Sequence, residues 1–291
     1  MSRVIFEKSN YKIIEADGDE LLIPVAQKLL ALSQEQEAKH ISLFGGSTVF
    51  KLFAYLEKSG LSEQINWNNL HLWWNDERLV EHTSSESNYG ELNRKYLSKL
   101  NINAENIHPI QGFTQDKLEY SYVEAEVNRM TDLVRELIPA NSQGIPSFDL
   151  IVLGIGDDGH TASLFPAVFD LETTDWYIPA FHPLTSQPRI SQSLELINAA
   201  KEICFIASGA GKAHILGQTI PAVAGVLLLQ DLIRQQHQDY NIYQVVKEKF
   251  GNEYVLVYVG LNSKTTMYLD SEAAKEIDVN TLTELSNNLA K

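Results

Sequence analysis

The sequence is short of cysteine and of positive charge, and each shortage excludes a class of protein. Its one cysteine, Cys204, cannot form an internal disulfide, and the apolar neighbours in residues 203–206 (ICFI) predict a buried structural thiol. Lys and Arg number 23 against 38 Asp and Glu, which gives a formal net charge of −15. No stretch gathers a long run of Lys or Arg, so we expect no nucleic-acid partner.

Long apolar runs and repeats are also missing. No apolar run reaches membrane-spanning length, and residues 1–8 (MSRVIFEK) lack the longer apolar segment of a signal peptide. We therefore expect a cytoplasmic protein without a membrane partner. The 291 residues contain no internal repeat or low-complexity linker, and at 44% hydrophobic they suffice for one large α/β domain or two small ones.

The most informative stretch of the sequence is residues 148–160 (FDLIVLGIGDDGH). The apolar residues 148–153 predict a strand that is buried on both faces of a parallel sheet. Glycines then allow a sharp turn, in which Asp157, Asp158 and His160 place three ionisable side chains within four positions. Ligands bind at the carboxyl ends of such strands in open α/β sheets, so this turn is the first candidate site.

Other interpretations of this turn must be weighed. Its glycine spacing is weak evidence by itself and, with His160 directly behind it, does not predict NAD binding. A divalent metal on Asp157, Asp158 and His160 is an alternative, but the sequence has no matching second cluster of ligands and we do not predict one. A lone histidine is more often structural than catalytic. Here, Asp157 and Asp158 lie three and two positions before His160, which favours a catalytic role, since a carboxylate can hold an imidazole in one tautomer.

Two more predicted strand ends carry polar groups. Residues 41–44 predict a short strand before the turn at residues 45–48 (GGST), and a helical pattern starts at Val49. Free backbone N–H groups, two hydroxyls and a helix N-terminus suit a phosphate, whereas an ordinary helix cap is the alternative. The turn lacks the lysine of a Walker loop, so no nucleoside triphosphate is indicated. Residues 69–80 predict another strand that ends in the charged residues 76–78 (DER).

The few cations near predicted turns are informative in an acidic protein. A net-negative chain must concentrate cations locally to bind an anion, which draws attention to Arg78, Arg189 and Lys212. Lys212 lies in the first turn of a predicted helix, where a cation is disfavoured unless an anion pairs with it or it extends into solvent. Ser87 or Asn88 is a helix cap or a ligand contact.

The remaining patterns predict scaffold. We expect helices at residues 19–34, 115–138, 231–250 and from 271, and strands at residues 176–180, 203–207, 254–259 and 265–269. A short helix should follow Arg189. The buried side of the helix at 115–138 is predicted to comprise Leu118, Tyr122, Ala125, Met130, Leu133, Val134 and Leu137.

Together these motifs resemble the 6-phosphogluconolactonase family, in the superfamily it shares with glucosamine-6-phosphate deaminase. The matching stretches are residues 45–48 (GGST), 76–78 (DER) with 87–88 (SN), 154–166 (GIGDDGHTASLFP), 189–191 (RIS) and 197–213. The resemblance implies one Rossmann-like α/β domain over residues 1–291, with a mainly parallel central sheet flanked by helices on both faces. It also implies hydrolysis of 6-phospho-D-glucono-1,5-lactone to 6-phospho-D-gluconate in the oxidative pentose phosphate pathway, without a cofactor.

The resemblance further implies roles for individual residues. His160 would be the general base for the attacking water, oriented by Asp157 or Asp158, with Asp76 near the sugar. Backbone N–H groups or a guanidinium would stabilise the oxyanion. The groups implied to bind substrate and its phosphate are Gly45, Gly46, Ser47, Thr48, Arg189 and Lys212, with Arg78 close by.

Two alternative functions stay open. One is a glucosamine-6-phosphate deaminase/isomerase-type enzyme. Such enzymes have a motif like Asp-Glu-Tyr where this chain has residues 76–78 (DER), with Arg78 in place of the tyrosine, and they carry a glutamate at the position of Phe165. A non-catalytic sugar-phosphate-binding regulator would use the same pocket, although the presence of His160 argues against it. Such a regulator would present an atypical inserted segment at about residues 225–254 to a partner; the segment could equally be a lid, a dimer contact or padding. The family usually has proline at the position of Val49.

Overall fold

An eight-stranded sheet forms the centre of the molecule in the computed structural model, which describes all residues except 1, 114–118, 236–240 and 289–291. Within the described residues the strand order is β1-β2-β11-β10-β7-β3-β4-β6, and every pair except β1 with β2 is parallel. The strands are β1 (Arg3–Lys8), β2 (Tyr11–Glu15), β3 (Lys39–Leu43), β4 (Leu70–Trp74), β6 (Ile107–His108), β7 (Leu150–Leu153), β10 (Glu202–Ala207) and β11 (Lys264–Leu269). The predicted fold class is confirmed.

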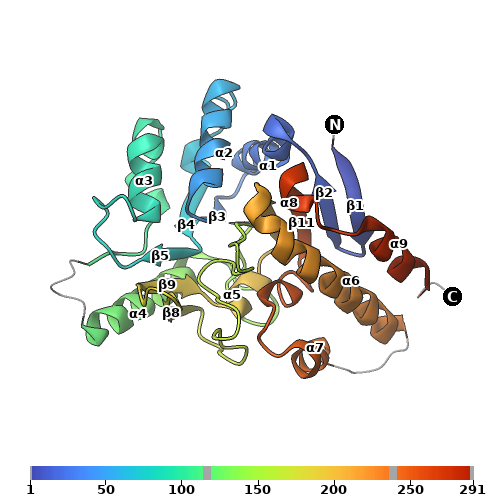
Figure 1. Ribbon diagram of the computed structural model, residues 1–291. Coiled ribbons are helices and arrows are strands. Elements are labelled where there is room, and N and C mark those ends of the chain that lie inside the picture. Colours follow the sequence, from blue (N-terminus) through green and yellow to red (C-terminus); the bar gives the residue numbers. More distant parts are fainter. Residues whose placement is uncertain (1, 114–118, 236–240, 289–291) are drawn as a thin grey trace.

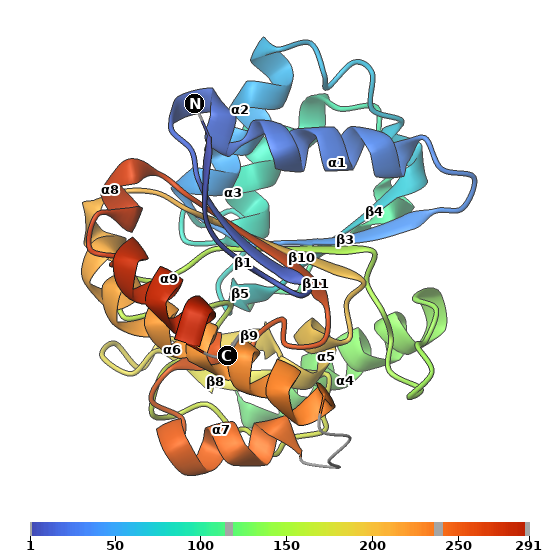
Figure 2. The same ribbon diagram turned by 90° about the vertical axis from the view of Figure 1, so that its right-hand side faces the viewer.

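Helices cover both faces of this sheet (Figures 1 and 2). One face carries α1 (Ile23–Ser33), α2 (Ser47–Lys58) and α3 (Asn88–Lys95). The other carries α4 (Tyr120–Leu137), α5 (Leu194–Asn198), α6 (Ala213–Gln235) and α7 (Ile242–Phe250), with α9 (Val279–Asn288) against α6 and β1. The short α8 (Ser271–Ala274) directly follows β11.

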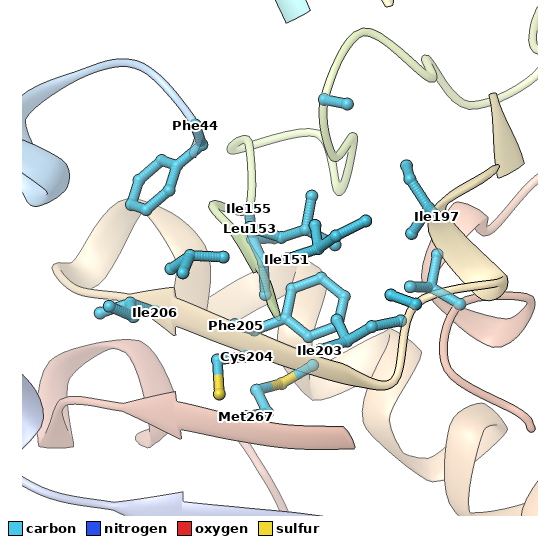
Figure 3. Packing of buried hydrophobic residues seen from close by; sticks show 14 of the residues in the cluster. Phe44, Ile151, Leu153, Ile155, Ile197, Ile203, Cys204, Phe205, Ile206 and Met267 are labelled. Carbon is cyan, nitrogen blue, oxygen red and sulfur yellow. The ribbon is translucent and has the colours of Figure 1, made fainter. Parts of the chain in front are cut away.

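The apolar periods of the sequence account for these elements. All four residues of β7 are buried, as expected for a strand covered on both faces. Helix α2 buries Val49, Leu52, Phe53 and Leu56, the spacing of one helical face. Figure 3 shows the core formed where β7, β10 and β11 pack side by side. Cys204 lies in this core, where burial raises the pKa of its thiol to about 12, so the predicted structural thiol is confirmed.

A second, three-stranded antiparallel sheet was not expected. It consists of β5 (Asp76–Arg78), β9 (Pro188–Gln192) and β8 (Tyr177–Phe181), in that order. The strand predicted at residues 69–80 is confirmed over Leu70–Trp74 (β4). Its predicted extension to the charged residues is wrong, because the chain then enters the second sheet at Asp76. Strand β9 escaped prediction because its buried residues are largely polar, which removes the alternating apolar signal. The pairing places Arg78 opposite Arg189.

Other elements differ from expectation. The strand predicted at residues 254–259 is wrong, since this apolar run contains the 3-10 helix η7 (Val255–Val257); a short buried run does not by itself distinguish strand from helix. In α4 the buried residues are Val123, Glu126, Met130 and Val134, so Tyr122 and Ala125 were wrongly assigned to that side and are exposed. The predicted start of that helix, with Leu118, lies outside the described residues. The β1–β2 hairpin was not predicted.

The segment at about residues 225–254 contains the end of α6 and the whole of α7. The single helix predicted at residues 231–250 is therefore wrong, since α6 ends at Gln235 and α7 begins after its cap, Asn241. Helix α6 passes Gly225 without a break, and α7 packs through the buried side chains of Ile242 and Val246. Residues 210–235 are the one described helical stretch long and apolar enough to cross a membrane, which corrects the expectation of no such run. Half of its apolar 18-residue window is buried inside the fold, and such burial also occurs in the core helices of folded domains.

Candidate active site

The turns that follow β3, β4, β7 and β10 surround one cavity of about 730 Å³. Carboxyl ends of neighbouring parallel strands meet at the same edge of a sheet, which explains why residues far apart in the sequence gather there. All the candidate residues line this cavity: Gly45, Gly46, Ser47, Thr48, Asp76, Arg78, Asp157, Asp158, His160, Arg189 and Lys212.

His160 is oriented by Asp158. The Nδ1 atom of His160 lies 2.5 Å from Oδ1 of Asp158, which also accepts the backbone N–H of His160 at 3.1 Å. Burial would raise the pKa of Asp158, but the bonds and charge of His160 outweigh it and lower that pKa to about 2. An ionised Asp158 can only accept, so Nδ1 carries the proton and Nε2 has the free lone pair. A β-carbon on Gly156 would lie 2.2 Å from Nδ1, so this approach requires glycine.

Asp157 faces a different partner. Its Oδ1 contacts Nζ of Lys212, which comes from the 3-10 turn η6 (Ala210–Lys212) after β10. Most of the Asp157 side chain is exposed, whereas Lys212 is largely covered. The two adjacent aspartates therefore contact different partners, and Lys212 has the paired anion that its helix-start position suggested.

The turn at residues 45–48 leads directly into α2. Gly46 precedes the helix, and Ser47 and Thr48 form its first turn, whose backbone N–H groups have no acceptor within the helix. No acidic residue occupies this first turn. The side chain of Asn88 lies 1.8 Å from where a β-carbon of Gly45 would be, so only glycine allows α2 and α3 to approach this closely. Val49, where proline was expected, is fully buried in the core.

A buried polar group forms the floor of the cavity. Oδ2 of Asp76 accepts a hydrogen bond from the Ser163 hydroxyl at 2.6 Å and lies 3.7 Å from Nη1 of Arg189. Arg189 is 6% exposed, and its guanidinium lies over the Phe165 ring at 5.4 Å. Burial lowers the pKa of Arg189, with Asp76 opposing that shift. Its Nε is buried without a partner in the described chain, as is that of Arg78, so both guanidinium groups retain donor capacity beside the cavity.

Glu77 holds this wall together and was not singled out from the sequence. Its carboxylate accepts the backbone N–H groups of Arg78, Asn88 and Tyr89, each at 2.8 Å, and the hydroxyl of Ser87 at 2.9 Å. Ser87 also caps α3 by accepting the N–H of Gly90, which confirms the predicted cap. Burial raises the pKa of Glu77 to about 7. The four hydrogen bonds oppose this rise, because they favour the ionised form.

The three ionisable groups of the central turn are not gathered around one point. Asp158 turns to His160, while Asp157 turns to Lys212. Across the described part of the chain, no group of three or more His, Cys, Asp or Glu side chains is arranged to hold a metal ion.

Comparison with known proteins identifies the family. Residues 17–225 match the family described as glucosamine-6-phosphate isomerases/6-phosphogluconolactonase. The chain is also 42% identical over 200 residues to the 6-phosphogluconolactonase of Aggregatibacter actinomycetemcomitans, an overlap of 68% of this chain and 81% of that protein. The chain belongs to this family.

Solved structures with the same fold include two that are matched over almost their whole length. The devB protein has a TM-score of 0.73 at 37% identity, with 92% of this chain and 99% of that chain covered. A monomeric glucosamine-6-phosphate deaminase has a TM-score of 0.65 at 17% identity, with 91% of this chain and 99% of that chain covered. The fold is thus shared with a deaminase and does not by itself identify the reaction.

Phe165 and Arg78 occupy the two positions at which the resemblance described above separates lactonases from deaminases. Phe165, at the position where deaminases carry a glutamate, is 2% exposed and packs against the His160 ring at 4.7 Å. An apolar ring there supplies no acid for amine expulsion. Arg78 occupies the position at which the resemblance implies a tyrosine in deaminases. Two further residues were not named as site residues from the sequence: His182 lines the cavity, and Ser163 bonds Asp76. The Ser163 bond joins residues 87 positions apart, which no local pattern indicates.

Proposed function

We propose that this protein hydrolyses 6-phospho-D-glucono-1,5-lactone to 6-phospho-D-gluconate, the second step of the oxidative pentose phosphate pathway. The observation that carries the proposal is the His160–Asp158 pair beside a cation-rich cavity in which Phe165 replaces an acid. The family and its 6-phosphogluconolactonase relatives support the same reaction.

The phosphate end of the substrate would lie at the start of α2. Gly45, Gly46, Ser47 and Thr48 offer N–H and hydroxyl donors there, and Lys212 supplies a charge. Arg189 and Arg78 complete the set of cations around the cavity. Arginine remains charged at neutral pH and presents several donors, which suits phosphate and sugar oxygens.

Hydrolysis then needs a general base that activates a water molecule beside the carbonyl carbon of the lactone. Nε2 of His160 takes a proton from water as the water oxygen attacks the lactone carbonyl, and Asp158 stabilises the imidazolium that forms. The carbonyl oxygen becomes an oxyanion, stabilised by backbone N–H groups or a guanidinium. The C–O bond to the ring oxygen breaks as the tetrahedral intermediate collapses, and the imidazolium returns its proton to that oxygen. Asp76, held by Ser163, keeps Arg189 in place near the sugar.

The setting of the reaction follows from the same proposal. The substrate is a small sugar-phosphate lactone, so no nucleic acid or membrane takes part, and we expect the enzyme to act in the cytoplasm. No described residue between 225 and 254 lines the cavity. We infer that the described residues of this atypical segment do not form a lid over it.

The test is hydrolysis of freshly generated lactone, corrected for spontaneous opening, with glucosamine 6-phosphate offered in parallel. Wild type should accelerate lactone opening, and His160→Asn should lower kcat by about a hundredfold while 6-phosphogluconate still binds. Normal turnover by His160→Asn would remove His160 from the mechanism. Release of ammonia from glucosamine 6-phosphate without lactone opening would contradict the proposed reaction.

A further inference from the structure

His182 lies at the rim of the cavity on a fixed turn. It begins the loop that joins β8 to β9, and its backbone N–H donates to the carbonyl of Gln187 at 3.0 Å, while the N–H of Ser186 donates back to the His182 carbonyl at 2.8 Å. His182 lines the same cavity as His160 and Arg189. The hairpin thus holds the His182 ring over a site whose other walls come from the central sheet.

Hydrogen bonds fix which nitrogen of His182 carries the proton. Its Nδ1 is 3.3 Å from the backbone nitrogens of both Leu184 and Thr185, and these N–H groups can only donate. An accepting Nδ1 holds a lone pair, so the neutral ring carries its proton on Nε2. Burial, followed by the charges of Arg189 and His160, lowers the pKa of His182, which favours the neutral form. No hydrogen bond engages Nε2 within the described part of the chain.

The two histidines of the cavity therefore have opposite tautomers. Phe165 separates them, with its ring centroid 4.7 Å from that of His160 and 5.2 Å from that of His182. His160 presents a lone pair at Nε2, because Asp158 binds its Nδ1–H. His182 presents an N–H at Nε2. One ring is arranged to accept a proton and the other to donate a hydrogen bond.

The cations of the site indicate which substrate atom this donor would bind. A phosphate dianion gains most from charged donors, and Lys212, Arg189 and Arg78 all line the cavity. A neutral N–H is better matched to an uncharged oxygen. We propose that His182 is a substrate-positioning residue whose Nε2–H binds a carbonyl or hydroxyl oxygen of the sugar lactone; this rests on the proposed lactonase function.

The test compares two substitutions on two substrates. His182→Phe keeps an aromatic ring against Phe165 but removes the donor, whereas His182→Gln keeps an amide donor. His182→Phe should lower kcat/KM by about tenfold, the size of one hydrogen bond, and equally for phosphorylated and unphosphorylated gluconolactone. His182→Gln should recover most of that loss, and both variants should unfold at the wild-type temperature.

Three results would overturn the assignment. Full activity of His182→Phe would leave the donor without a role. A loss restricted to the phosphorylated lactone would mean that His182 binds the phosphate. Equal losses in His182→Phe and His182→Gln would mean that the imidazole acts through packing.

Calorimetric binding of 6-phosphogluconate separates this proposal from the lactonase reaction. If wild type does not open the lactone, the proposed function fails, but the donor is still tested by product affinity. His182→Phe should then bind 6-phosphogluconate about tenfold more weakly than wild type, with His182→Gln close to wild type. Unchanged affinity in His182→Phe would refute the donor on its own.

Discussion

Adjacent side chains in the catalytic turn have separate tasks. Asp158 holds the ring of His160, and Asp157 neutralises Lys212. On the proposal that Lys212 binds the phosphate, Asp157 competes with the substrate for this cation. We therefore expect Asp157 to weaken phosphate affinity rather than to assist the chemistry.

Substitution of the two aspartates should have opposite kinetic effects. Asp157→Asn should lower KM for the phosphorylated lactone by about two- to fivefold, since a solvent-exposed ion pair contributes at most about 1 kcal/mol, and kcat should stay near wild type. Asp158→Asn should lower kcat by at least about tenfold, because the imidazole loses its orienting anion. Steady-state kinetics on both lactones check this.

A double substitution gives the control. In a Lys212→Ala background, Asp157→Asn should no longer change KM, since the cation it competes for is gone. A fall in kcat for Asp157→Asn as large as that for Asp158→Asn would contradict the division of roles.

At the scale of elements, the β5–α3 unit depends on one carboxylate. Glu77 accepts four donors from both ends of the loop that joins β5 to α3. Arg78 ends β5 on one side of this loop, and Asn88 begins α3 on the other. The carboxylate thus replaces the carbonyl acceptors that a helix start lacks. The position of Arg78 in the cavity wall follows from this local arrangement.

Glu77→Gln should loosen that wall. An amide nitrogen cannot accept, so buried N–H groups lose their partner and the free energy of unfolding should fall by about 1–3 kcal/mol. KM for the phosphorylated lactone should rise as Arg78 loses its anchor. Urea denaturation and kinetics measure the two effects. The exposed Glu81→Gln should change stability by less than about 0.5 kcal/mol, and a similar result for Glu77→Gln would disprove the anchoring role.

For the whole molecule, a histidine cluster lies at the end of the sheet opposite the cavity. His40, His71 and His108 come from β3, β4 and β6; Nδ1 of His71 is 2.9 Å from Nε2 of His108, and the His40 and His71 ring centroids are 4.8 Å apart. Burial first, and then the charge of His71, lowers the pKa of His40 to about 4 and that of His108 to about 3. Burial also lowers the pKa of His71.

The cluster should make the fold sensitive to acid. In the unfolded chain the three imidazoles bind protons near pH 6.5, whereas in the folded chain they do not. The free energy of unfolding therefore keeps its full value above that pH and falls as the pH drops toward about 4. Each histidine changes the free energy of unfolding by at most about 1.4 kcal/mol per pH unit in this window. His108→Gln should therefore flatten the decline of unfolding free energy between pH 6.5 and 4. The exposed His214→Gln should leave the slope unchanged, and equal slopes in all three proteins would exclude the cluster as its cause.

Local sequence pattern predicted much of the scaffold because its cause is local. The apolar run of β7 and the helical spacing of α2 can be read within a few residues, and a parallel sheet brings the turns after such strands to one edge. The scarcity of cations in an acidic chain likewise drew attention to the lysine and arginines that line the cavity.

The sequence by itself determined the fold class, the family and the candidate residues that proved to line the cavity, since these depend on periods and motifs along the chain. Only the tertiary structure decided which partner each residue has. Lys212 pairs with Asp157 across 55 positions, and Ser163 bonds Asp76 across 87. The second sheet, the exposed face of α4 and the helical turn at residues 255–257 were decided in the same way. Burial against distant segments, which no local window contains, selects among conformations that the local sequence leaves nearly equal in free energy.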